Sequence, residues 1–400
     1  MVNVAILGYG TIGSGVANVL WTNKEVIDKK TGEDVRLKYV LDLRDFPGDK
    51  VESILTHDFN TILEDDSVQV VVETMGGLKP AYDFVKKCLL AGKSVCTSNK
   101  ALVENSGAEL NAIAAEKNAN FLFEASVGGG IPIIRPINEC ITADVILEIS
   151  GILNGTTNYI LTKMGSEGLD FGTVLKEAQD LGYAEKDPTA DVEGHDAGRK
   201  IAILSSLAAG SQVNFEDVYT EGITKITDRD FEYAKTLSAT IKLVATSKLA
   251  ENGGRCVMVT PRMLPLTHPL AGVNGVMNAI FVKGNMLGEA MFYGAGAGSL
   301  PTASAVAGDI VDAVRNLGHN KKAEWKSEPL KLLSVDDVKN RFFVRISGDN
   351  EDAARKAFGE GQIVRVTNGE FAYVTGEMTE KAFAEAKETL EGVLGYIRYA

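Results

Sequence analysis

The sequence predicts an α/β protein with an N-terminal doubly wound parallel sheet, an α+β middle part and a small C-terminal βαββαβ domain. Three observations lead to this prediction. The chain opens with an apolar strand that ends in a G-x-G-x-x-G turn, strands and helices then alternate to about residue 135, and residues 340–400 repeat a strand–helix order at smaller scale. A chain of 400 residues, 45% of them apolar, has ample length for two to four domains.

The N-terminal part, residues 1–135, is predicted to run strand, turn, helix and then to alternate. Residues 3–7 form an apolar strand that ends at Gly8, and the segment after Gly13 has helical periodicity. A helix beginning at Pro80 is predicted over 80–91. Further strands are predicted at 37–43, 68–73, 93–97 and 120–124. This order predicts a Rossmann sheet, which we expect a helix within 300–318 to complete.

The pattern changes over residues 136–300, which we expect to form a second, α+β domain. Strands are predicted at 145–153, 255–264, 279–284 and 288–296, and the segment NGTTN is predicted to be a loop. Helices are predicted at 159–168, 171–182 and 195–210. The polar residues 319–339 are predicted to be a linker.

The tail, residues 340–400, is predicted to have the ferredoxin-like order βαββαβ, with a hairpin across Asn368 and Gly369. A helix is predicted over 380–395. Because the earlier segments end before the linker, we expect an enzyme without the tail to stay folded and active.

Charge and residue spacing exclude several functions. A net charge of −13 argues against a nucleic-acid-binding surface. No apolar stretch of about 18 residues and no signal peptide is present, so we expect a cytoplasmic protein that does not enter a membrane. The four cysteines form no C-x-x-C pair, so we expect no structural zinc site and no disulfide framework. The four histidines are dispersed, so we expect no catalytic transition metal.

The glycine-rich turn predicts a nicotinamide dinucleotide site. Gly8 allows the tight turn, Gly10 lets the backbone approach a pyrophosphate, and Gly13 permits close packing of helix on strand. An acidic residue after the second strand suits the ribose of NAD, whereas a basic residue suits the 2′-phosphate of NADP. Asp42 and Arg44 offer both, and Arg44 could instead only pair with a neighbouring aspartate on the surface. The choice between NAD and NADP stays open.

Residues 182–200 combine five acidic side chains with Lys200, which lies four residues after Asp196. One interpretation is a site for an amino-acid-like ligand; the other is a solvated acidic loop followed by an i,i+4 ion pair. The apolar run that follows Lys200 places this lysine near the interior and favours the first interpretation. Hydride transfer needs a group that stabilises an alkoxide-like oxygen, and Lys200 is the best candidate. Lys100, after a sheet strand, is the second.

Long motifs connect these features. The chain contains GYGTIG, VVETMGG, AGKSVCTSNKAL, FEASVGGGIPIIRP, GILNGTTNYIL, AQDLGYAEKDPTADVEGHDAGRK, LPLTHPLAGVNGVMNA and YGAGAGSLPTASAVAGD. With them it resembles the homoserine dehydrogenase family over nearly its whole length. The resemblance implies NAD(P)-dependent interconversion of L-homoserine and L-aspartate 4-semialdehyde, in the biosynthesis of threonine, methionine and isoleucine. The tail is similar to the ACT regulatory domain of bacterial members.

The resemblance also implies residue roles. Besides Asp42 and Arg44, the cofactor residues are Gly8, Gly10, Thr11, Ile12, Gly13, Thr74, Ser98, Lys100 and Gly298. The substrate residues are Gly155, Thr156, Tyr183, Glu185, Asp191, Asp196 and Lys200, with Lys200 as proton donor, Asp196 as its partner and Glu185 on the substrate ammonium. A monovalent cation, sodium or potassium, is implied at Glu124, Val127, Gly129 and Ile131, mostly through backbone carbonyls. Family members form homodimers or homotetramers, so the resemblance implies that residues 136–300 are the catalytic and dimerisation domain. Threonine is a possible effector at the tail.

Two other functions compete with this prediction. A different amino-acid semialdehyde oxidoreductase of the phosphorylating type needs a nucleophilic cysteine with a base. Cys96 lies in an apolar strand, Cys140 lies in a predicted helix, and neither has an evident histidine partner. A non-enzymatic nucleotide-sensing protein with an ACT-like effector module needs neither Lys200 nor the acidic cluster.

Overall fold

Residues 1–321 and 323–400 are described by the computed structural model, in which the chain divides into two units. The first unit contains residues 1–143, 202–214 and 294–330, and the second contains residues 144–201, 215–293 and 331–400. Residue 322, within the predicted linker 319–339, lies outside the described residues. Among the described helices, none is both long enough and apolar enough to cross a membrane.

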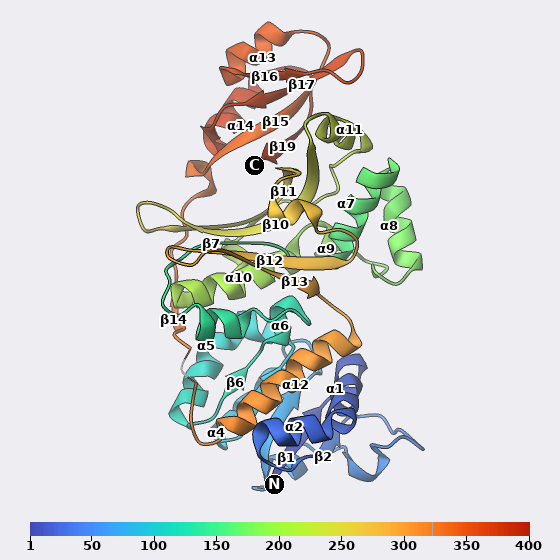
Figure 1. The fold of residues 1–400 in the computed structure, drawn as a ribbon, viewed down its shortest axis with the longest axis vertical. Coiled ribbons are helices and arrows are strands. Elements are labelled where there is room, and N and C mark those ends of the chain that lie inside the picture. Colours follow the sequence, from blue (N-terminus) through green and yellow to red (C-terminus); the bar gives the residue numbers. More distant parts are fainter. Residues whose placement is uncertain (322) are drawn as a thin grey trace. The chain divides into compact units, whose positions relative to one another are not determined.

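A parallel sheet of six strands forms the centre of the first unit, as the sequence predicts (Figure 1). The strand order is β3-β2-β1-β4-β5-β6, and all five pairings are parallel. The strands are β1 (Val2–Leu7), β2 (Val35–Leu41), β3 (Leu55–Thr56), β4 (Val68–Glu73), β5 (Ser94–Thr97) and β6 (Phe121–Leu122). Strand β3 is missing from the prediction. Because β2 ends at Leu41 instead of residue 43, Asp42 and Arg44 lie in the turn after the strand.

Helices flank this sheet, and one of them comes from a distant part of the chain. They are α1 (Thr11–Thr22), α2 (Lys24–Thr31), α3 (Asn60–Leu63), α4 (Ala81–Leu90), α5 (Lys100–Glu116), α6 (Ala125–Gly128) and α12 (Ser299–Arg315). A Cβ atom on Gly15 of α1 would lie only 3.0 Å from the Cβ of Ala303, so the glycine lets α12 pack closely on α1. Val16 and Ile310 share one apolar cluster with the inward side chains of β1. Helix α12 therefore contributes to the core of the first unit.

Part of the predicted linker has fixed structure in the first unit. Strand β14 (Lys326–Pro329) pairs in parallel with β8 (Ser211–Gln212). The buried indole of Trp325 donates a hydrogen bond to Oε1 of Gln212 at 2.9 Å. A Cβ atom on Gly107 of α5 would lie 2.5 Å from the Trp325 ring, so the glycine makes room for it. Burial of this one large aromatic side chain orders a segment whose other residues are mostly polar.

In the second unit, the strand order begins β13-β12-β7-β10-β11. These strands are β7 (Ile146–Ile152), β10 (Ala239–Leu249), β11 (Arg255–Pro265), β12 (Met277–Gly284) and β13 (Gly288–Ala295). The helices that carry site residues or neighbour them are α7 (Gly155–Glu167), α8 (Phe171–Asp180), α9 (Thr189–Val192), α10 (His195–Ala209) and α11 (Asp228–Thr236). The prediction of a loop over the segment NGTTN is wrong, since α7 already begins at Gly155. The side chain of Asn154 accepts a hydrogen bond from the Thr157 N–H at 2.9 Å and caps the helix.

The tail has the predicted order βαββαβ with one added two-residue strand, β18 (Met378–Thr379), which precedes the second helix and pairs antiparallel with β15 (Figure 1). Its elements are β15 (Lys339–Ser347), α13 (Glu351–Phe358), β16 (Gly361–Val364), β17 (Glu370–Thr375), α14 (Glu380–Glu388) and β19 (Val393–Tyr399). The strands lie in the order β19-β15-β17-β16 and pair antiparallel. The helix predicted over 380–395 ends at Glu388. Phe342 and Phe383 stack with their ring centroids 3.7 Å apart in a core of the tail's own.

The tail sheet is continuous with the sheet of the second unit. Strand β19 pairs in parallel with β11, and Arg398 lies opposite Arg262. The buried guanidinium of Arg398 donates to the carboxylates of Glu221 and Glu380, both at 2.7 Å. These contacts join the tail to the rest of its unit, and that the chain stays folded and active without the tail remains a prediction.

Candidate active site

The glycine-rich turn has the geometry that a bound pyrophosphate requires. Gly8 has a φ of +95°, which only glycine adopts without strain. A Cβ atom on Gly13 would lie 1.9 Å from the Gly8 carbonyl oxygen, whereas a Cβ on Gly10 would meet nothing within 4 Å. Among the described residues, no side chain caps the N-terminus of α1 at Thr11. The first N–H groups of α1 therefore fit a phosphate beside Gly10, Thr11 and Ile12.

Asp42 and Arg44 form one hydrogen-bonded group that is attached to this turn. The backbone N–H of Tyr9 donates to Oδ2 of Asp42 at 2.8 Å. Arg44 donates to Asp42 through Nε and Nη2, both at 3.0 Å, and to the Tyr9 carbonyl oxygen at 3.1 Å. The Arg44 guanidinium holds the pKa of the Asp42 carboxyl well below its usual range. Arg44 does pair with a neighbouring aspartate, but both side chains lie beside the glycine-rich turn.

Glu73, which sequence reasoning missed, organises the loops after β4 and β5. Its fully buried carboxylate accepts hydrogen bonds from the Met75 N–H at 2.8 Å, the Gly76 N–H at 3.1 Å and the Thr97 hydroxyl at 2.6 Å. Burial raises the pKa of Glu73 above its ordinary value. The available signal was an acidic residue at the end of an otherwise apolar strand.

The remaining cofactor candidates lie on these same loops or at the start of α12. The hydroxyl of Thr74 donates to the Gly8 carbonyl oxygen at 2.8 Å and so connects the loop after β4 to the glycine-rich turn. Ser98 follows β5, and Lys100 is the first residue of α5. Gly298, with a φ of +115°, precedes α12. The structure thus places these residues at the carboxyl ends of parallel strands or at a helix start, where α/β sheets bind ligands.

Lys200 lies at the centre of a buried network in the second unit. Its Nζ donates to the Leu153 carbonyl oxygen and to Oδ2 of Asp196, both at 2.8 Å. The side-chain amide of Asn154 donates to Oδ2 of Asp196 at 2.9 Å and to Oδ1 of Asp191 at 2.7 Å. Lys200 and Asp196 are both buried. The prediction that Lys200 lies near the interior is confirmed. The i,i+4 ion pair of the alternative interpretation also forms, between Asp196 and Lys200, but both of its side chains are buried.

Two predicted substrate residues lie outside this network. The Glu185 side chain is exposed, whereas Lys200 and Asp196 are buried. Tyr183 is also exposed, and its carbonyl oxygen accepts a hydrogen bond from the Thr156 hydroxyl at 2.6 Å. The structure therefore connects Tyr183 to the start of α7 through its backbone.

A second lysine, Lys242, supports the start of α7 from β10. Its Nζ donates to the Val273 carbonyl oxygen at 2.6 Å, to Oδ1 of Asn274 at 3.0 Å and to Oδ1 of Asn158 at 3.1 Å. Lys242 is 1% exposed, and no carboxylate of the described chain forms an ion pair with it. Burial lowers its pKa to about 8. Sequence reasoning missed Lys242, although a lysine in the apolar run of β10 was the available signal.

The predicted cation residues surround a tight turn. The Glu124 carboxylate accepts hydrogen bonds from the backbone N–H groups of Ile133, Ile134 and Arg135 at 2.5, 2.8 and 2.9 Å. This carboxylate is therefore committed to capping backbone groups. Gly129, in the turn between Glu124 and Ile133, has a φ of +56°. The arrangement fits a cation only through the backbone oxygens of Glu124, Val127, Gly129 and Ile131.

Cys96 lacks the properties of a nucleophile. Its thiol is completely buried in β5, and burial raises its pKa well above the ordinary value. Because the thiolate is the reactive form, this cysteine does not support a covalent mechanism of the phosphorylating type.

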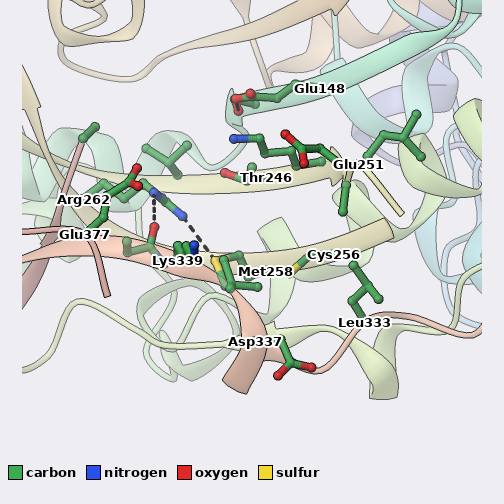
Figure 2. Close-up of a pocket in the computed structure, with 18 of the residues that line it drawn as sticks. Glu148, Thr246, Glu251, Cys256, Met258, Arg262, Leu333, Asp337, Lys339 and Glu377 are labelled. Carbon is green, nitrogen blue, oxygen red and sulfur yellow. Dashed lines mark hydrogen bonds between the residues drawn. The ribbon is translucent and has the colours of Figure 1, made fainter. Parts of the chain in front are cut away.

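A cavity of about 740 Å³ lies elsewhere in the second unit (Figure 2). It is bounded by strands β7, β10 and β11 and by the first residues of the tail, and Glu148, Thr246 and Lys339 are among its lining side chains. Arg262 donates to Oδ1 of Asn340 and, in a weaker contact, to Sδ of Met258, both at 3.2 Å. None of the predicted cofactor or substrate residues lines this cavity. The cavity is therefore separate from the residues that the sequence predicts for cofactor and substrate.

Comparisons with known proteins place both the glycine-rich turn and the Lys200 network within matches to one family. A family model described as "Homoserine dehydrogenase, NAD binding domain" matches residues 8–124, and one described as "Homoserine dehydrogenase" matches residues 132–311. The homoserine dehydrogenase of Mycobacterium tuberculosis is 42% identical over 354 residues, which cover 86% of this chain and 80% of that protein. The crystal structure of a homoserine dehydrogenase from Thiobacillus denitrificans is 37% identical, with a TM-score of 0.90, and the match covers 100% of this chain and 98% of the other. A hyperthermophilic archaeal homoserine dehydrogenase, solved in complex with NADPH, is 30% identical with a TM-score of 0.66 over 78% of this chain and 97% of the other.

Proposed function

The chain belongs to the homoserine dehydrogenase family, and on this basis we propose a role in the reaction for each residue of the site. The protein is an NAD(P)-dependent oxidoreductase that interconverts L-homoserine and L-aspartate 4-semialdehyde in amino-acid biosynthesis. When bound, the nicotinamide supplies or accepts the hydride at its C4 atom. The negative charge that develops on the aldehyde oxygen during reduction has to be neutralised by the protein.

Lys200 is the proton donor to that oxygen in our proposal. The supporting observation is that its Nζ is buried and held by two acceptors, the Leu153 carbonyl oxygen and Asp196, at 2.8 Å each. A lysine fixed in this way has little freedom to lose when the substrate binds, so its proton is already oriented. In the oxidation of homoserine the same nitrogen accepts the hydroxyl proton. Lys100 is the second candidate for this role.

Other residues of the second unit hold the amino-acid part of the substrate in this proposal. The N–H groups of Gly155 and Thr156 at the start of α7 suit the substrate carboxylate. Asp191, Asp196 and Glu185 provide negative charge for the ammonium, and Tyr183 borders the site. Because Glu185 is exposed, its contact with the substrate requires the loop at 182–188 to close over it.

The cofactor residues are proposed as the sequence predicts them, from Gly8 to Gly13 for the pyrophosphate and Thr74, Ser98, Lys100 and Gly298 nearer the nicotinamide. Asp42 is proposed to bind the ribose of NAD, and Arg44 the 2′-phosphate of NADP. NADPH is present in the archaeal relative, which supports acceptance of NADP. Both residues are hydrogen-bonded to the backbone of Tyr9, so the same turn would bind either cofactor.

We also propose the remaining family properties. A sodium or potassium ion would be held by the backbone oxygens of Glu124, Val127, Gly129 and Ile131 and would rigidify that turn. The tail, with the strand order of the ferredoxin-like fold, is proposed to be an ACT-like regulatory module with threonine as its effector. A homodimer or homotetramer and a cytoplasmic location remain predictions.

The mechanism is tested by replacing Lys200. Because general acid catalysis contributes about 10²–10⁴-fold, Lys200→Ala should lower kcat by that order while the KM for the cofactor stays nearly unchanged. Lys200→Arg should not restore activity, since a guanidinium does not release its proton near neutral pH. Lys176→Ala is the matched control, because Lys176 also forms an i,i+4 pair with an aspartate, Asp180, but on the surface. Near-wild-type turnover of Lys200→Ala would transfer the acid role to Lys100 or to water.

A further inference from the structure

Asn278, near the start of β12, has a buried side-chain oxygen without a hydrogen-bond partner in the described chain. The residue is 2% exposed. Strand β12 pairs antiparallel with β7, and Ala279 lies opposite Ile152. The register therefore places Asn278 beside Leu153, whose carbonyl oxygen accepts the hydrogen bond from Lys200.

The unpartnered oxygen lies close to the first turn of α7. A Cβ atom on Gly155 would lie 3.5 Å from Oδ1 of Asn278. Ala279 and Phe281 belong to an apolar cluster with Ile152, and Met277 packs against the same cluster. Because side chains alternate along a strand, Asn278 lies on the other face of β12.

The position of Asn278 is fixed by its neighbours. The amide of Asn158 donates to the Met277 carbonyl oxygen at 2.9 Å and to the Val273 carbonyl oxygen at 3.1 Å, and Lys242 donates to Val273 as well. These polar groups around the segment are satisfied, whereas Oδ1 of Asn278 is not. An unsatisfied buried acceptor destabilises the folded protein, which makes a ligand donor the natural partner at this position.

We propose that Oδ1 of Asn278 accepts a hydrogen bond from the α-ammonium group of the amino-acid substrate. Asn154, which precedes Gly155, brings the carboxylates of Asp191 and Asp196 to the same end of α7. Acceptor oxygens therefore gather around the start of this helix, and such a group attracts a cationic donor. The inference rests on the proposed placement of the substrate at the Lys200 network.

The ammonium is present in both homoserine and aspartate semialdehyde, so its hydrogen bond contributes equally to binding in both directions. Asn278→Ala should raise the KM for both amino-acid substrates by about tenfold to a hundredfold, the usual effect of a lost hydrogen bond to a charged group. The kcat in each direction should change less than threefold, because the contact is the same in the ground state and the transition state. The KM for the nicotinamide cofactor should stay unchanged.

Two further variants separate a binding role from a structural one. Asn278→Asp keeps an acceptor oxygen and should hold both KM values within severalfold of wild type. The melting temperature of Asn278→Ala should fall less than that of Asn158→Ala, because the oxygen that Asn278→Ala removes is unsatisfied. Asn158→Ala is the matched control, since it removes a satisfied buried amide and should lower the melting temperature.

Each alternative outcome overturns the proposal. A rise of KM for homoserine alone would mean that Asn278 contacts the hydroxyl, which the aldehyde lacks. Unchanged KM values, or a melting temperature as low as that of Asn158→Ala with KM raised and kcat lowered together, would make Asn278 a structural residue. Failure of the Lys200 assignment is seen independently, because it would leave the kcat of Lys200→Ala near that of wild type without altering the effect of Asn278→Ala on KM.

Discussion

The choice between NAD and NADP depends on one exposed arginine and the carboxylate that it contacts. Arg44 donates to both oxygens of Asp42, and its own side chain is 62% exposed. The Arg44 guanidinium is free to turn toward solvent, and Asp42 keeps the Tyr9 N–H as a hydrogen-bond donor when it does. A 2′-phosphate at the end of β2 would then receive a charge-assisted and partly bidentate contact from Arg44. We therefore expect Arg44→Ala to impair the use of NADP specifically.

The size of this effect follows from the number of contacts exchanged. A hydrogen bond to a charged group contributes about 1.5–3 kcal/mol, which corresponds to a factor of about 10 to 100 in kcat/KM. The fall should be confined to NADP, because NAD has no 2′-phosphate and Asp42 remains in Arg44→Ala. Asp42→Ala should change the ratio in the opposite direction, since it removes the acceptor for the ribose hydroxyls and leaves Arg44 without its partner.

The assay measures kcat/KM with NADP and with NAD under identical conditions for wild type, Arg44→Ala and Asp42→Ala. The ratio of the two values cancels general damage to the glycine-rich turn, which Asp42 contacts through the Tyr9 N–H. Arg36→Ala is the matched control, because Arg36, in β2, is also exposed and also pairs with an aspartate two residues before it, Asp34. An unchanged NADP/NAD ratio in both variants would refute the assignment of these residues to the ribose.

Three further perturbations test other parts of the molecule. Between pH 8 and 10.5 the unfolded chain keeps a proton on Lys242 that the folded chain has lost. The free energy of unfolding in urea should therefore rise with pH by about 3 kcal/mol in wild type relative to Lys242→Met. Parallel pH profiles of the two proteins would contradict this. Deleting residues 340–400 should lower the melting temperature, because β11 loses β19 and Asp230 loses its buried partner Arg345. The deletion should also abolish any inhibition by threonine. A truncated enzyme with wild-type melting temperature and kcat would show that the tail is independent. Glu185→Gln should raise the KM for homoserine more than it lowers kcat, and a loss confined to kcat would remove Glu185 from ammonium binding.

The parts of the fold that local patterns determine could be predicted from the sequence. Strand β4 and the glycine-rich turn follow from an apolar run and from glycine spacing, which act over a few residues. The short strand β3 and the pairing of β14 with β8 could not be predicted, because a two-residue strand has no periodicity and its partner is distant in sequence. The start of α7 was missed because its polar and β-branched residues have modest helix propensity, and the cap by Asn154 outweighs that preference.

The candidate site could be predicted to the extent that residue type reveals chemistry. Lys200 was identifiable because this charged residue directly precedes the apolar run of its helix. Glu73, Lys242 and Asn278 were not identified, because each acquires its importance from partners that the fold brings near, or from the lack of one. Their sequence surroundings are typical of ordinary strands.

The first unit is assembled from three separate stretches of the chain, which has a consequence for synthesis on the ribosome. The sheet is complete in sequence by residue 122, but α12 begins only at Ser299. Until that helix emerges, the surface of α1 around Gly15 and Val16 lacks the cover that Ala303 and Ile310 provide. A nascent or prematurely terminated chain therefore presents an apolar patch to chaperones and to other chains, and its dinucleotide-binding half reaches its final form only when more than three quarters of the protein has been made.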